Sequence, residues 1–243
     1  MSEPTILATS GGLRRGERTY YGFAPLLMHA IELAGVEGRA PRVCYVGTAG
    51  GDQRWLSALF TEAGQAAGAD VTSLVVFPMP SVADPAGLVL DQDVVWVDGG
   101  SVANLLALWR LHGLDEVFRQ AWQAGVVLAG VSAGSICWHA GGPTDSFGPD
   151  LRPVTDGLGL LPYSNGVHYD SESRRRPAYH RFVAEGILPG GYATDDGVGL
   201  VYRGTQLAEA VTEVRGKGAY QVVCESGQVR EERIEPRVLP GAR

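Results

Sequence analysis

The chain has 243 residues, of which 45% are hydrophobic and 19% are charged, a balance typical of a globular protein with a full core. Its formal net charge of −7, without a basic tail, argues against a nucleic-acid-binding surface. No apolar run approaches the length of a membrane span, and the first ten residues lack the pattern of a signal peptide. We therefore expect a cytoplasmic protein that binds neither nucleic acid nor membrane. Cys44, Cys137 and Cys224 are far apart in apolar stretches and indicate reduced core thiols, not disulfides or a metal site.

The first half of the chain alternates short apolar strands with helices. Strands are expected at 5–10, 43–48, 71–77, 94–98 and 126–131, and helices at 23–33 and 53–67. Residues 104–111 and 114–124 are expected to form one helical segment that is interrupted or ended near Gly113. This alternation predicts βαβ units. The expected fold class is α/β, a doubly wound and mostly parallel sheet with helices on both faces.

The pattern changes after Trp138. Residues 141–189 are rich in Gly, Pro, Asp and Ser and show little periodicity, which predicts a long functional or poorly ordered loop. From Val198 onward, short β-rich runs separated by glycine turns predict antiparallel C-terminal hairpins at the sheet edge. We expect a single domain over 1–243, with 235–243 as a loose tail.

The most informative stretch is Gly130-Val131-Ser132-Ala133-Gly134, which follows a buried strand and leads into a helix-like segment. A G-x-S-x-G sequence at a strand-to-helix turn is typical of a nucleophile elbow. The glycines let the backbone turn sharply without a Cβ clash, and the helix that begins at Ala133 directs free N–H groups toward a nearby negative oxygen. We interpret Ser132 as a nucleophile.

A nucleophilic serine needs a base and a group that orients the base. Among the five histidines, His168 is favoured because it lies in the loop-like region, whereas His139 is expected two helical turns beyond Ser132 and out of reach. For the acid, spacing alone leaves Asp145, Asp150 and Asp156 open. The Ala133 N–H is one expected oxyanion donor, and the turn that contains Gly99 and Gly100 is the best candidate for a second.

Three segments together resemble the peptidase E family of aspartyl dipeptidases, to which cyanophycinases are distantly related: Val97 to Leu106, Gly113 to Asp115, and Ala124 to Ser135. The resemblance implies a class I glutamine-amidotransferase-like fold, with Ser132 as nucleophile and His168 as base. For the acid, the resemblance favours Asp145, with Asp150 as the alternative. It also supports the assignment of Gly99 and Gly100 as oxyanion donors.

The resemblance also implies an arginine, after the catalytic histidine, that binds the aspartate side chain of the substrate. Arg175 fits that position best, with Arg174 and Arg176 as alternatives. The family's common Gly-Gly-Asn is Gly-Gly-Ser here, which weakens the expectation of a strict aspartate preference.

The predicted function is a serine peptidase that acts on short peptides, first among them dipeptides with N-terminal Asp. The alternatives are a serine esterase or amidase, a cyanophycinase-like peptidase of different selectivity, and a non-catalytic binding protein. No metal or cofactor is expected, and the chain is expected to act either alone or as a homodimer.

Overall fold

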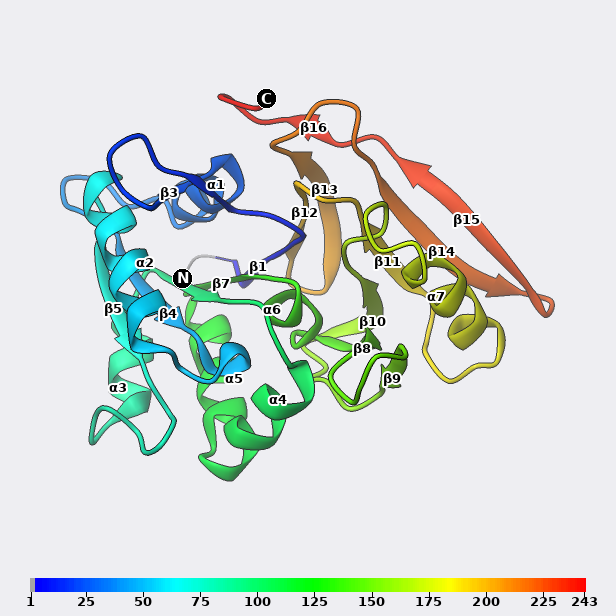
Figure 1. Ribbon diagram of the computed structural model, residues 1–243, viewed down its shortest axis with the longest axis horizontal. Coiled ribbons are helices and arrows are strands. Elements are labelled where there is room, and N and C mark those ends of the chain that lie inside the picture. The colour runs from blue at the N-terminus through cyan, green and yellow to red at the C-terminus, as the bar shows by residue number, and fades with distance from the viewer. Residues whose placement is uncertain (1–2) are drawn as a thin grey trace.

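The computed structural model describes residues 3–243, and its central layer is a predominantly parallel sheet (Figure 1). The strands of this larger sheet are β1 (Thr5–Thr9), β4 (Arg42–Val46), β5 (Asp70–Leu74), β6 (Val94–Val97), β7 (Val127–Val131), β12 (Val198–Arg203), β13 (Gln206–Thr212) and β16 (Arg237–Val238). Within the described residues their order is β16-β13-β12-β1-β7-β6-β4-β5. Within this order, the five neighbouring strands β1, β7, β6, β4 and β5 are all parallel. Strand β12 runs antiparallel to both of its neighbours, β1 and β13. The prediction of an α/β fold with a parallel sheet is confirmed.

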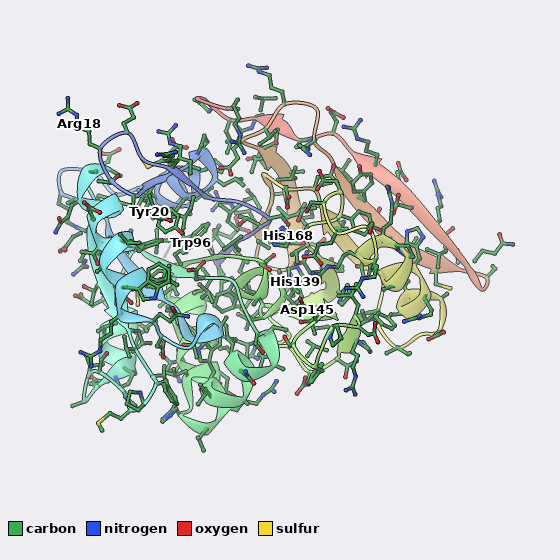
Figure 2. All side chains as sticks on the ribbon, in the orientation of Figure 1. Arg18, Tyr20, Trp96, His139, Asp145 and His168 are labelled. Carbon is green, nitrogen blue, oxygen red and sulfur yellow. The ribbon has the colours of Figure 1, made fainter. Side chains whose placement is uncertain are left out.

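The central strands are buried on both faces, as their continuous apolar runs predict. In β6, Val94 and Trp96 belong to one hydrophobic cluster, while Val95 and Val97 belong to another. Trp96, labelled in Figure 2, packs in the cluster that α1 and α2 help to form. The other cluster receives side chains from α4, α5 and α6. The helices are α1 (Pro25–Leu33), α2 (Arg54–Ala66), α3 (Pro85–Leu90), α4 (Val102–Leu111), α5 (Leu114–Ala124), α6 (Ala133–Ile136) and α7 (Arg175–Ala184), with a 3-10 turn η1 (Thr48–Gly50).

A second sheet occupies much of the region that the sequence predicts as loop. Its strands are β8 (His139–Thr144), β9 (Arg152–Val154), β10 (Leu161–Gly166), β11 (Gly191–Thr194), β14 (Ala219–Glu225) and β15 (Gln228–Ile234), in the order β15-β14-β11-β10-β8-β9. Figure 1 shows this sheet and α7 on the opposite side of the molecule from α2 and β5. The expectation of a long loop over 141–189 is therefore wrong. Its Gly-rich strands pack backbone against backbone: a Cβ at Gly141 would lie 2.0 Å from the carbonyl oxygen of Val154.

Two smaller expectations also differ from the structure. Residues 235–243 are not a loose tail, because β16 pairs with β13, Leu239 is buried, and the Arg243 N–H donates to the Glu213 carbonyl at 3.1 Å. Cys44 and Cys137 are buried thiols, but Cys224 on β14 is exposed. The hairpin formed by β2 (Leu13–Arg15) and β3 (Tyr21–Phe23) lies between β1 and α1. In the described part of the chain, no helix is long and apolar enough to cross a membrane.

Candidate active site

Ser132 lies at the carboxyl end of β7, in the conformation of a strained turn. Its φ and ψ are 57° and −112°, a region that residues with a Cβ rarely adopt. The Ser132 N–H donates to the Thr9 carbonyl at 3.1 Å, and the Ser132 carbonyl accepts from the N–H groups of Ser135 and Ile136. The strain is therefore held by hydrogen bonds from both sides, and this is the geometry expected at a nucleophile elbow.

The two glycines that flank Ser132 are required by close packing of the backbone. A Cβ at Gly130 would lie 2.4 Å from the carbonyl oxygen of Gly134, and a Cβ at Gly134 would lie 2.2 Å from that of Val97. Both distances are far inside van der Waals contact. The glycines thus let α6 begin directly against β6 and β7, which brings the N-terminus of α6 beside Ser132.

His168 follows β10, and its backbone is hydrogen-bonded to the end of β1 in the larger sheet, where Ser132 is also bonded. Its φ of 52° is another positive value for a non-glycine residue. The His168 N–H donates to Ser10 Oγ at 3.1 Å, and Ser10 Oγ shares a hydrogen bond of 2.7 Å with Thr194 Oγ1. Since Ser132 is bonded to Thr9 and His168 to Ser10, two consecutive residues at the end of β1 hold the candidate nucleophile and base.

The carboxylate at the ring of His168 belongs to Asp196. Its Oδ1 lies 2.5 Å from His168 Nδ1, and the two side chains are 43% and 25% exposed. Asp196 follows β11, which pairs in parallel with β10, so both residues lie just beyond the carboxyl ends of adjacent strands. The sequence argument sought the acid only between Ser132 and His168. The signal that it missed is the pair Asp195-Asp196 directly after a short apolar strand.

The three carboxylates that spacing left open have other environments. Asp145 is exposed just after β8, and Figure 2 shows it below His168 on the side of β9. Asp150 is 94% exposed and lies 3.5 Å from Arg174, while Asp156 pairs with Arg110 at 2.8 Å. The structure therefore places none of these three carboxylates at His168, in contrast to the expectation that Asp145, or else Asp150, orients the ring of His168.

Asp196 is supported in turn by Asp170. The Asp196 N–H donates to Asp170 Oδ1 at 2.8 Å, and Asp170 Oδ2 forms an ion pair with Lys217 Nζ. Burial alone would raise the pKa of the Asp170 carboxyl, but the hydrogen bonds from Lys217 and from Asp196 outweigh it and hold that pKa below its usual value. Asp170 is thus kept as an anion directly behind the His168–Asp196 pair.

Of the three expected oxyanion donors, two are open. The Gly99 N–H donates to Asp98 Oδ1 at 2.9 Å, whereas among residues 3–243 the N–H groups of Gly100 and Ala133 make no hydrogen bond. A Cβ at Gly99 would lie 3.9 Å from Ser132 Oγ, so this turn lies against the serine. A side chain here would crowd Ser132. Gly100 N–H and Ala133 N–H are the donors that a substrate oxygen could use.

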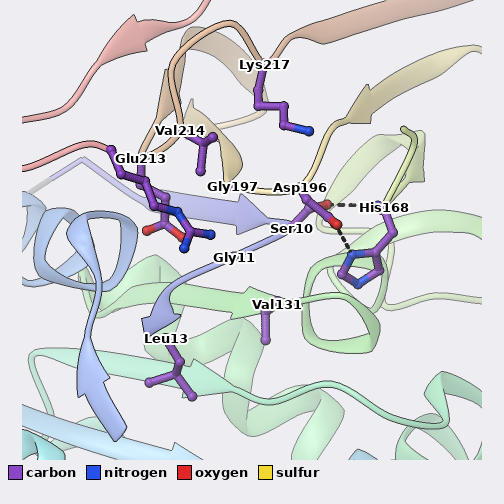
Figure 3. A pocket seen from close by; sticks show the side chains of 11 residues that line it. Ser10, Gly11, Leu13, Val131, His168, Asp196, Gly197, Glu213, Val214 and Lys217 are labelled. Atoms are coloured by element: carbon purple, nitrogen blue, oxygen red, sulfur yellow. Dashed lines mark hydrogen bonds and ion pairs between the residues drawn. The ribbon is translucent and has the colours of Figure 1, made fainter. Parts of the chain in front are cut away.

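A cavity of about 500 Å³ opens beside the His168–Asp196 pair (Figure 3). Ser10, Gly11 and Leu13 line one side, Val131 lies next to Ser132, and Lys217 reaches in from the turn before β14. The volume falls within the range of small-molecule sites, about 300–1,000 Å³. In the described chain, no group of three or more His, Cys, Asp or Glu side chains is arranged to hold a metal ion.

His139 does not continue a helix from Ser132, as the sequence suggested. The helix α6 is only four residues long, and His139 begins β8 in a fully buried position. Its Nδ1 lies 2.9 Å from the Ser135 carbonyl and its Nε2 3.3 Å from Tyr202 Oη. Burial lowers the pKa of His139 to about 4, so the ring is neutral near pH 7 and has a structural environment.

Arg175 is not available to a substrate. It is 3% exposed, and it donates to the Pro143 carbonyl and to Glu172 Oε2, each at 2.5 Å. The expectation of a substrate-binding Arg175 is therefore wrong, because the first turn of α7 folds inward onto β8. Arg176 lies over the rings of Tyr169 and Tyr220 and pairs with Glu231, and Arg174 is an exposed residue near Asp150.

Comparison with known proteins relates the chain to peptidases. The model of peptidase family S51 matches residues 6–210. The chain belongs to this family. It is 42% identical over 191 residues to the uncharacterized peptidase YgaJ of Bacillus subtilis (strain 168), covering 79% of this chain and 82% of the relative. It is 28% identical over 155 residues to peptidase E of Shewanella denitrificans, covering 62% and 63%.

Two solved structures share the fold of this S51 chain. A peptidase from an acI-B1 actinobacterium superposes with a TM-score of 0.67 at 18% identity, covering 96% of this chain and 95% of the other. A candidate peptidase E from Listeria monocytogenes EGD-e gives 0.60 at 16% identity, covering 96% and 100%. The resemblance to the peptidase E family is thus confirmed, and the protein is a serine-type peptidase.

Proposed function

We propose that this S51 peptidase hydrolyses short peptides through Ser132, His168 and Asp196. The observation that carries the proposal is the 2.5 Å contact between Asp196 Oδ1 and His168 Nδ1, beside a serine in an elbow conformation. With Nδ1 bonded to Asp196, the Nε2 atom of His168 is left to accept the serine proton. Asp196 replaces Asp145 as the orienting acid in this proposal.

The reaction follows from these positions. Ser132 Oγ attacks the peptide carbonyl carbon while His168 Nε2 takes its proton, and the Gly100 and Ala133 N–H groups stabilise the oxyanion. His168 then gives the proton to the leaving nitrogen, and the C–N bond breaks to leave an acyl-serine. Water, deprotonated by His168, attacks the ester and releases the acid and Ser132. The pairing with Asp196 favours the cationic ring in both steps.

Dipeptides with N-terminal Asp are the first substrates to test, since the family resemblance of the sequence implies them. With Arg175 buried, the residue preference must come from other groups around the cavity. The experiment is hydrolysis of an Asp-X panel, matched neutral dipeptides and p-nitrophenyl esters by the purified protein. Hydrolysis of esters alone would replace the peptidase proposal with an esterase.

A fluorophosphonate probe tests the nucleophile directly. Labelling is expected at Ser132 in the natural chain and absent in Ser132→Ala, with hydrolysis reduced by at least about 10³-fold. Because the strand and turn around Ser132 do not depend on its hydroxyl, the thermal unfolding curve should remain cooperative. Activity within tenfold of the natural chain would refute the assignment.

A further inference from the structure

Lys217 is the only lysine in the chain, and the other 19 of the 20 basic residues are arginines. It lies in the turn between β13 and β14, and its side chain enters the cavity beside His168 (Figure 3). An arginine would present a broad planar fork, whereas the lysine ammonium is a compact point charge. The position of this single lysine therefore needs a chemical explanation.

A continuous set of contacts joins Lys217 to the catalytic pair. Lys217 Nζ pairs with Asp170, Asp170 accepts the Asp196 N–H at 2.8 Å, and Asp196 contacts His168 at 2.5 Å. The Lys217 side chain is 35% exposed. An ammonium carries three donors, and in the described chain only the one to Asp170 is used, so two remain for a ligand in the cavity.

The other carboxylates at the cavity are already paired. Asp196 is bonded to His168, and Glu213, which is buried, accepts the N–H groups of Gly12 and Leu26 at 3.1 and 3.0 Å. Burial raises the pKa of Glu213, and the two backbone hydrogen bonds together with Arg243, the second cation of the cavity wall, offset only part of that rise. Of these two cations of the cavity wall, Lys217 is the one that a series of contacts connects to His168.

The proposed reaction determines which part of a peptide substrate lies beside His168 and Lys217. His168 must give its proton to the leaving nitrogen, so the leaving residue lies next to His168. In a dipeptide that residue ends in a free α-carboxylate. In a longer or amidated peptide the same place holds a neutral amide.

We propose that Lys217 binds the free α-carboxylate of the leaving amino acid and thereby restricts cleavage to peptides that end one residue after the scissile bond. This inference rests on the proposed function, because it places the leaving residue by the proton that His168 returns. It explains dipeptidase selectivity through the leaving side, independently of any preference for the N-terminal residue. A charge-assisted contact to the ammonium would be lost with an amide, which offers no negative charge.

The first test compares dipeptides with the same dipeptides amidated at the C-terminus. The natural chain should prefer the free acid in kcat/KM by about 10- to 150-fold, the range for a hydrogen bond to a charged group. Lys217→Met should remove that preference, so that the ratio of the two kcat/KM values falls to about one, even where both values fall together because Asp170 has lost its cation. Lys217→Arg should restore part of it, and Arg230→Met, a control on the exposed surface of β15, should change neither. An equal loss on acid and amide in Lys217→Met would make the residue structural and overturn the proposal.

The second test does not use hydrolysis. Acetic anhydride forms stable amides only at amines, here Lys217 and the amino terminus, so the rate of N-acetylation of the peptide that contains Lys217 reports one side chain by mass spectrometry. Free leucine should slow this reaction, and leucinamide at the same concentration should not. Equal rates with both ligands would contradict carboxylate binding at Lys217. If Ser132→Ala stayed active while leucine still protected Lys217, the proposed mechanism would fail and the carboxylate site would stand.

Discussion

Replacing Asp196 with asparagine tests the triad most directly, because the change keeps the size of the side chain and removes only its charge. The amide would no longer favour a protonated His168 ring and could stabilise the wrong tautomer. In the best-studied triad this substitution lowers kcat by about 10⁴. Since the Asp196 side chain is 43% exposed, water can replace part of its effect, and we expect a loss of about 10² to 10⁴.

The matched control is Asp145→Asn, at the position that the family resemblance favoured. Asp145 is exposed and makes no contact with His168 in the described structure, so kcat should change by less than about twofold. The assay is kcat and kcat/KM on the best dipeptide, together with the rate of fluorophosphonate labelling and a thermal unfolding curve for each variant. A loss of 100-fold in Asp145→Asn with activity kept within tenfold in Asp196→Asn would refute the reasoning.

Three further predictions concern stability. Ser132→Gly should abolish hydrolysis yet raise the free energy of unfolding by about 1 kcal/mol in urea titrations, because glycine relieves the strained φ of 57°; a lower stability would contradict this. The pKa of His139 is about 4 in the folded chain and about 6.5 in the unfolded chain. Between these two pH values the unfolded state therefore binds more protons than the folded state, and the free energy of unfolding should fall by about 2 kcal/mol from pH 7 to pH 5. His139→Gln should flatten that dependence, and an unchanged slope would exclude His139 as its source. Arg175→Met should lower the free energy of unfolding by about 2–4 kcal/mol, because it leaves Glu172 and the Pro143 carbonyl without their donor. The same variant should reduce kcat/KM equally for acidic and neutral substrates. A loss confined to Asp-X peptides would restore the role of Arg175 in selectivity.

Local sequence patterns were sufficient wherever a structure forms over a few neighbouring residues. The elbow at Ser132 joins β7 and α6 within about ten residues, and its glycines meet each other and β6 at close range. The helices α1, α2, α4 and α5 begin and end close to the predicted positions because their apolar periodicity is strong. The same local arguments failed from the end of α6 onward: this helix stops after four residues, at Ile136, and the Gly-rich strands that follow look like loop in the sequence.

The sequence by itself was enough to predict the parallel α/β core and to propose Ser132 and His168, since each depends on a strand and the turn that follows it. Only the tertiary structure pointed to Asp196 as the proposed acid, because its carboxylate reaches His168 across two adjacent strands of a sheet that no periodicity revealed. It also decided that Arg175 is buried and that Lys217 faces the cavity, 49 residues after His168 in the chain. Side chains at such separations meet because strands pair in a particular order, and that order is a property of the whole packed chain, not of any segment within it.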